Sequence, residues 1–122
     1  MAFLLTNPNP NGARVGDCVV RAISIAENQS WDKTYIDLCT FGYLLKDMPS
    51  SNAVFAEYLK NLGYSIHACP LCDTVEQFTI DNSEGIYILA TGSHVVCTKG
   101  NDYFDAWDSG QEHVAYYFKK EG

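Results

Sequence analysis

The chain has 122 residues, enough for one hydrophobic core but short for two, so residues 1–122 are predicted to form a single domain. Its 8 basic and 15 acidic residues give a formal net charge of −7, which would repel a phosphate backbone and argues against nucleic acid as a partner. The sequence has no apolar run near the roughly 20 residues that a membrane helix requires, which argues against a membrane partner.

The start of the chain and its cysteines predict a compartment. Residues 1–6 lack the basic region that precedes the apolar core of a secretory signal, and prolines follow within the first 10 residues. Five cysteines are an odd number for a chain without an export signal, which favours reduced thiols over a disulfide framework. A cytoplasmic protein is therefore expected.

The first half of the chain is predicted to be helical. Turn formers occupy residues 7–12, and apolar residues recur at helical spacing after them. Serines suited to N-caps precede the next two periodic segments, and Gly63 suits the position after the last of these helices. The charged Arg21 and Lys33 are expected to face solvent. Three helices are expected, over residues 18–28, 31–46 and 51–62.

The second half is predicted to be mainly extended, with one short helix at 75–80 after a capping box. Alternating, β-branched or aromatic segments are separated by connections short enough for antiparallel pairing. The aromatic residues 116–118 are expected at an edge of the sheet. Helices followed by antiparallel strands form an α+β pattern. The expected strands are 64–69, 85–90, 93–98, 103–107 and 113–118.

Cys18 is a candidate nucleophile because it opens the first predicted helix. The first backbone N–H groups of a helix have no internal partners and carry partial positive charge, so they lower the pKa of a nearby thiol. A single cysteine on a helix is more often a packing residue. A catalytic role therefore requires a base elsewhere in the chain.

A histidine and two aspartates in the predicted hairpin supply that base and a group to orient it. His94 opens one strand, and Asp105 and Asp108 lie near the end of the other. If Cys97 pairs with Phe104, Asp105 lies on the His94 side, whereas a three-residue turn places Asp108 opposite His94. The order Cys, His, Asp is that of a nucleophile, a general base and an orienting group.

Three short motifs resemble those of a known family. They are Asp17-Cys18 at a helix start, the strand Ser-His-Val-Val at 93–96, and the strand end Trp-Asp-Ser-Gly at 107–110. Together they resemble papain-like cysteine peptidases. Among these, the chain is most similar to the bacteriocin-leader peptidase domains of peptide exporters and to small uncharacterised phage or bacterial proteins.

The resemblance implies a papain-like α+β fold, with the nucleophile on N-terminal helices and the base on a C-terminal antiparallel sheet. It implies that Cys18 is the thiolate nucleophile, His94 the base and Asp108 the orienting acid. Asp108 is therefore preferred, with Asp105 as the alternative. The implied substrate is a peptide or protein.

The second oxyanion donor departs from the family pattern. The backbone N–H of Cys18 would supply one donor, and papain-like enzymes add a glutamine about six positions before the cysteine. That position here is Gly12. The side-chain amides of Asn11 and Asn9 are the candidates to replace it.

A second group of residues has the side chains of a metal site. His67, Cys69 and Cys72 offer three zinc ligands, but structural zinc needs a fourth and normally a second knuckle, and the remaining cysteines are isolated. No metal or cofactor is expected.

Three functions remain open. The first is a thiol hydrolase that cleaves a peptide or amide bond through an acyl-enzyme on Cys18. The second is a deamidase or acyl transferase with the same triad. The third is a catalytically inactive papain-like binding module, suggested by the missing glutamine and the small size of the chain.

Overall fold

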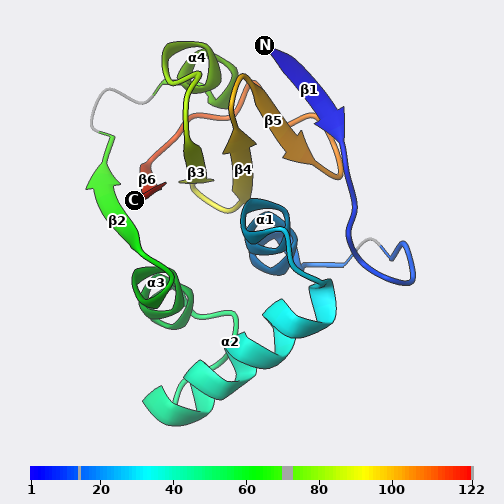
Figure 1. Ribbon diagram of the computed structural model, residues 1–122, viewed down its shortest axis with the longest axis vertical. Coiled ribbons are helices and arrows are strands. Elements are labelled where there is room, and N and C mark those ends of the chain that lie inside the picture. Colours follow the sequence, from blue (N-terminus) through cyan, green and yellow to red (C-terminus); the bar gives the residue numbers. More distant parts are fainter. Residues whose placement is uncertain (14, 70–72, 122) are drawn as a thin grey trace.

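The computed structural model describes residues 1–13, 15–69 and 73–121. Within these ranges the chain forms four helices and one six-stranded sheet (Figure 1), which confirms the predicted α+β class. None of the described helices is long and apolar enough to cross a membrane. The elements are β1 (Ala2–Leu5), α1 (Cys18–Glu27), α2 (Trp31–Leu45), α3 (Asn52–Asn61), β2 (Tyr64–Ala68), α4 (Val75–Asp81), β3 (Ile86–Ala90), β4 (Val95–Lys99), β5 (Asp102–Asp105) and β6 (Tyr116–Lys120).

Three of the described helices begin at capping residues. The Ser30 hydroxyl accepts a hydrogen bond from the Lys33 backbone N–H at 3.0 Å, and the Ser51 hydroxyl accepts one from the Ala53 N–H at 3.2 Å. Thr74 caps α4 in the same way. Each cap supplies an acceptor for a first-turn N–H group that has no partner inside its helix.

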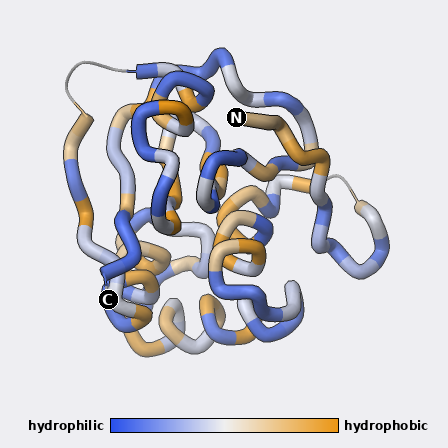
Figure 2. The backbone as a smooth tube through the Cα atoms, turned by 45° about the horizontal axis from the view of Figure 1, so that its top comes forward, coloured by the Kyte–Doolittle hydropathy of each residue, from blue (hydrophilic) through white to orange (hydrophobic). Residues whose placement is uncertain are grey.

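The sheet is covered on both faces. Successive residues of a strand point to opposite sides, so Ile88 belongs to the core under α1, α2 and α3, whereas Leu89 belongs to the core under α4. In the same way, Cys97 belongs to the first of these cores and Val96 to the second. Hydrophobic and hydrophilic residues alternate along the helical coils (Figure 2), as expected for helices with one buried side.

The register of the β4–β5 hairpin decides which aspartate lies on the same side as His94. Lys99 pairs with Asp102, so residues 100–101 form a two-residue connection, and Cys97 pairs with Phe104. This is the pairing for which the sequence predicted Asp105 on the His94 side. The hairpin lies inside the sheet, whose strand order is β1-β5-β4-β3-β6-β2.

Two strands differ most from the sequence prediction, and the strands expected at 93–98 and 103–107 are found at Val95–Lys99 and Asp102–Asp105. Residues Ala2–Leu5 form β1, which was not predicted and pairs in parallel with β5; all other neighbours in the sheet are antiparallel. The last strand starts at Tyr116 instead of His113 and lies between β3 and β2, so it is not an edge. A four-residue strand is too short to show a period, and its remote partner leaves no local signal.

Candidate active site

Cys18 is the first residue of α1, and the residue before it leaves the start of the helix open. Asp17 occupies the N-cap position, but its side chain makes no capping hydrogen bond. Its carboxylate instead accepts hydrogen bonds from the Trp31 indole Nε1 at 2.9 Å and from the Arg21 guanidinium. The first-turn N–H groups thus keep their partial positive charge beside the half-buried Cys18 thiol.

His94 is buried directly before β4, and a tight turn fixes its backbone. The Thr91 N–H donates to the His94 carbonyl oxygen at 2.8 Å. The ring Nε2 lies 2.6 Å from Asp105 Oδ2, and the ring packs on the Trp107 indole with centroids 4.7 Å apart. With Nε2 engaged by Asp105, Nδ1 is the ring nitrogen left to interact with the Cys18 side chain.

The thiol and the imidazole shift each other's ionisation in opposite directions. Burial alone would raise the pKa of Cys18, but hydrogen bonds from His94 and the Val95 backbone and the charges of His94 and Arg21 outweigh it, and the pKa is lowered. Burial alone would lower the pKa of His94, but hydrogen bonds and charges from Asp105 and Cys18 raise it to about 9. The pair therefore favours a thiolate beside an imidazolium.

Asp105 is the acid that the structure places against His94. Its carboxylate is buried, and Oδ2 also accepts a hydrogen bond from the Ser109 hydroxyl at 2.6 Å. Oδ1 accepts one from the Ala106 backbone N–H at 2.8 Å and lies 3.6 Å from Arg21 Nη2. These contacts fix both oxygens, so the carboxylate can hold the imidazole in one orientation.

Asp108, the preferred acid in the sequence analysis, lies elsewhere, and the order of preference is corrected. Its Oδ1 accepts hydrogen bonds from the Tyr103 hydroxyl at 2.6 Å and from the Gly110 backbone N–H at 2.9 Å. These two bonds lower the pKa of this exposed carboxyl. The cause is the two-residue hairpin connection, because β5 ends at Asp105 and leaves Asp108 in the loop beyond the strand.

Arg21 joins the helix of the thiol to the strand of the acid, and its expected exposure to solvent is wrong. The side chain is buried between the Asp17 carboxylate, to which Nη1 donates, and the Asp105 carboxylate. The signal in the sequence was the spacing of Asp17 and Arg21, four residues apart on one face of α1. The cation compensates two buried acids at once.

Neither predicted oxyanion donor lies at the thiol. Asn9 Nδ2 donates to Asp17 Oδ2 at 3.3 Å, and its Oδ1 accepts the Asn11 backbone N–H at 2.9 Å, so Asn9 stabilises the loop before α1. Asn11 is exposed in that loop. Among the described residues that line the cavity of about 250 Å³ at Cys18, neither is present, but Asn52 is, at the start of α3.

The suggested zinc ligands do not form a metal cluster within the described part of the chain. His67 is exposed on β2, where its ring stacks on Tyr117 with centroids 5.1 Å apart and its Nε2 lies 2.8 Å from the Ser65 hydroxyl. Cys69 is half-buried, and Cys72 lies outside the described residues. Residues 1–13, 15–69 and 73–121 contain no group of three or more His, Cys, Asp or Glu side chains placed to hold a metal ion.

Comparisons of the chain with protein-family models, with curated proteins and with solved structures find no match. Function is therefore inferred from the geometry of Cys18, His94 and Asp105.

The first prediction separates the two acids. In Asp105→Asn, the pKa of His94 should fall from about 9 toward its ordinary value, because an amide cannot compensate an imidazolium. In the matched Asp108→Asn variant it should stay near about 9. Titration of the His94 ring by NMR measures both, and a shift in Asp108→Asn alone would show that the wrong acid has been assigned.

The second prediction concerns the buried cation. Arg21→Gln should lower the free energy of unfolding by about 3–5 kcal/mol, because it leaves two buried carboxylates without their cation. The matched control is Lys33→Gln, which removes an exposed ion pair with Asp37 and should cost about 1 kcal/mol or less. Urea denaturation measures both values, and equal losses would contradict the bridging role of Arg21.

Proposed function

We propose that this chain is a thiol hydrolase of the papain-like type that cleaves a peptide or amide bond through an acyl-enzyme on Cys18. The observation that carries the proposal is the polarised pair of Cys18 and His94, with Asp105 behind the imidazole. The three side chains come from a helix start, a turn before β4 and the end of β5. Such a convergence of nucleophile, base and orienting acid is the arrangement of thiol acyl transfer.

In the first half of the reaction the Cys18 thiolate attacks the substrate carbonyl carbon and forms a tetrahedral oxyanion. The carbon–nitrogen bond then breaks, and the His94 imidazolium gives its proton to the leaving amine. In the second half neutral His94 takes a proton from water, whose oxygen attacks the thioester. Release of the acid regenerates the thiolate and the imidazolium, so no other reactant is needed.

The oxyanion has two candidate donors in this site. The backbone N–H of Cys18 belongs to the uncapped first turn of α1. Asn52 lines the same cavity, and we assign to its side-chain amide the role expected earlier of Asn9 or Asn11. Loss of one such donor typically costs about 10²–10³ in rate, so the second donor matters for catalysis.

The Trp107 indole supports the same interpretation. It packs on the His94 ring and shields the ring from water. A hydrogen bond is electrostatically stronger where water is excluded. The contact therefore helps Asp105 to hold the imidazolium.

A catalytically inactive binding module would not need a polarised thiol. Cys97 provides the contrast within the same chain, because complete burial raises its pKa to about 12. The pKa of Cys18 is lowered despite its own burial. This difference favours an enzyme over a module that keeps its cysteine only for packing.

The third prediction uses the reactivity of the thiols. At mildly acidic pH, iodoacetamide should alkylate Cys18 faster than the other four cysteines, because its thiolate persists below the ordinary thiol pKa. His94→Ala should remove most of this advantage, since the side-chain hydrogen bond and the charge of His94 that lower the pKa of Cys18 disappear. Mass spectrometry of each labelled cysteine gives the rates. Equal, slow labelling of all five in the unmodified protein would favour the binding module.

The fourth prediction tests turnover. The chain should cleave members of a synthetic peptide library, and Cys18→Ala should abolish cleavage, whereas Cys39→Ala should retain it. The rate should rise as pH passes the lowered pKa of Cys18 and fall as pH rises through about 9, where His94 loses the proton that the leaving amine needs.

Mass spectrometry of the products separates the alternatives. New peptide termini support hydrolysis. Intact peptides in which glutamine has become glutamate, or in which an amine has been added, support the deamidase or transferase. Cleavage that survives in Cys18→Ala would contradict the proposed nucleophile.

A further inference from the structure

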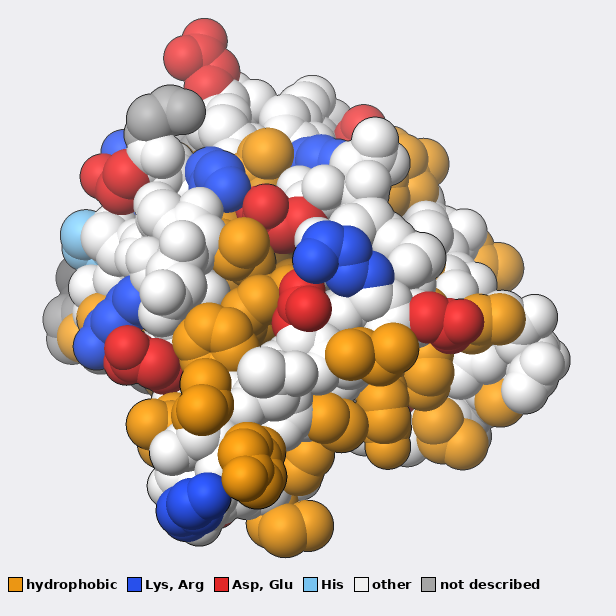
Figure 3. Space-filling model, turned by 60° about the horizontal axis from the view of Figure 1, so that its bottom comes forward, with side chains coloured by type: hydrophobic (Ala, Val, Ile, Leu, Met, Phe, Trp, Pro, Cys, Tyr) orange, Lys and Arg blue, Asp and Glu red, His pale blue; other side chains and the backbone are white. Residues whose placement is uncertain are grey.

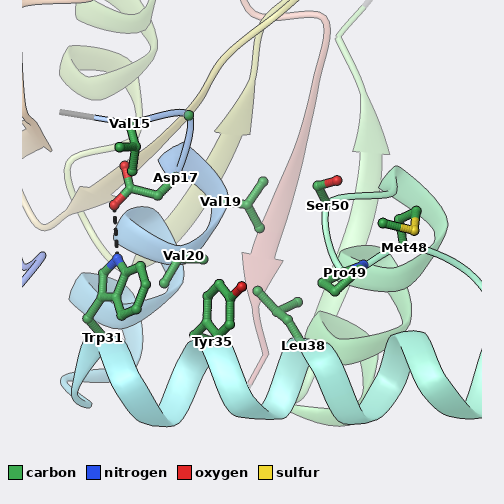
Figure 4. A pocket seen from close by; sticks show the side chains of 11 residues that line it. Val15, Asp17, Val19, Val20, Trp31, Tyr35, Leu38, Met48, Pro49 and Ser50 are labelled. Carbon is green, nitrogen blue, oxygen red and sulfur yellow. Dashed lines mark hydrogen bonds between the residues drawn. The ribbon is translucent and has the colours of Figure 1, made fainter. Parts of the chain in front are cut away.

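Helix α2 lies at one end of the molecule, and α1 and α3 lie between it and the sheet (Figure 1). Its inner side packs on the rest of the protein. Thr34, Leu38 and Gly42 are buried at intervals of four residues, and the Thr34 hydroxyl accepts a hydrogen bond from a serine hydroxyl of α1 at 2.8 Å. Trp31 and Leu38 point from α2 toward α1 (Figure 4).

The outer side of α2 carries apolar side chains where a surface helix normally carries charged ones. Ile36 is 62% exposed, Tyr43 is 71% exposed and Leu44 is 66% exposed. Together with Thr40 they recur at intervals of three and four residues, so they share one face, about half a turn away from the buried residues. These four residues are called here the outer face of α2.

A row of this kind differs from single exposed apolar residues, which are common on protein surfaces. The outer face extends over about two helical turns from Ile36 to Leu44. Hydrophobic side chains gather on the side of the molecule that comes forward in Figure 3, where the end that carries α2 faces the viewer. A contiguous apolar surface is typical of a site that another molecule covers.

The charges along α2 restrict the nature of that molecule. The chain has a formal net charge of −7, but α2 and the two positions after it are nearly neutral. Their charged residues are Lys33 and Lys46 against Asp32, Asp37 and Asp47. A strongly basic or strongly acidic partner would therefore find little complementary charge here, whereas two copies of this chain can approach with little repulsion.

The order of residues along α2 fits a second copy of the chain. Thr40 is the centre, Ile36 and Leu44 lie four positions to either side, and Lys33 and Asp47 lie seven positions to either side. If two α2 helices meet antiparallel with Thr40 at the two-fold axis, Ile36 of each copy meets Leu44 of the other. Lys33 then lies near Asp47 of the other copy. Apolar and oppositely charged groups are matched in one register, as a two-fold interface requires.

We propose that this protein forms a two-fold symmetric dimer through the outer faces of two antiparallel α2 helices. The dimer is independent of the proposed function. None of the four residues of the outer face lines the cavity at Cys18, so the interface does not use the catalytic cavity.

The first test is sedimentation velocity of the full chain over a micromolar concentration series, under reducing conditions that prevent disulfide formation. The unchanged chain should pass from monomer to dimer as its concentration rises. Ile36→Asp and Leu44→Lys should each raise the dissociation constant about tenfold or more, because each variant places unpaired charges in the apolar contact.

An equimolar mixture of these two variants tests the register. In a mixed dimer the introduced carboxylate of one copy meets the introduced ammonium of the other, and the second pair is the original Leu44 with the original Ile36. The mixture should therefore dimerise at concentrations where each variant alone is monomeric. Native mass spectrometry identifies the mixed dimer by the masses of its two chains.

Ile80→Asp is the matched control. Ile80 is 47% exposed on α4, so the substitution places the same charge on an exposed apolar position of another helix. This variant should dimerise like the unchanged chain. Circular dichroism should give the same helix content for every variant, which separates loss of the dimer from loss of the fold.

A chain that stays monomeric at every concentration overturns the proposal, and so does an equal loss of dimer in Ile80→Asp. A mixture that stays monomeric overturns the antiparallel register. If the monomeric chain binds phosphatidylcholine vesicles and Leu44→Lys does not, the outer face belongs to a lipid surface instead.

Iodoacetamide labelling keeps this inference apart from the proposed function. Selective labelling of Cys18 should be the same in the dimer and in the monomeric variants. Selective labelling in a chain that never dimerises overturns the dimer and leaves the hydrolase standing. A dimer in which iodoacetamide does not select Cys18 supports the interface and overturns the hydrolase.

Discussion

The contact between Asp105 and His94 is the interaction on which the rest of the site depends. It spans 2.6 Å between two buried groups, so it would be unfavourable without compensation. Ser109 supplies a further donor to the carboxylate, and Arg21 supplies the opposite charge. Because Arg21 belongs to the helix that begins with Cys18, the same charges that stabilise the contact also hold Cys18 against the sheet.

Much of the architecture is local in origin and was predictable. Helix periods, serine caps and short connections indicated an α+β chain, and Cys18 was expected at a helix start. The identity of the acid depended on strand register, where one residue of slip exchanges the two faces. The sequence indicated Asp105 and Asp108 as the two candidates for the acid beside His94. The family resemblance favoured Asp108, whereas the observed two-residue connection places Asp105 there.

Other features had no local signal. Asn52 lines the cavity at Cys18, but it lies far along the chain from the loop that a papain-like pattern indicates. The hollow lined by Val19, Tyr35 and Met48 likewise arises from the packing of α1 against α2, which no single segment encodes. Both follow from how helices stack, and the sequence pattern specifies only which side of each helix is buried.

The first strand has a practical consequence. Leu5 pairs with Asp105, and the Thr6 N–H donates to the Asp105 carbonyl oxygen at 2.7 Å, so the beginning of the chain clamps the backbone of the acid. A change in β1 that weakens this pairing would therefore also loosen the backbone that carries the Asp105 carboxylate, although the two segments lie far apart in the sequence. The orientation of the His94 ring, which Asp105 holds, is in this way tied to residues 2–6.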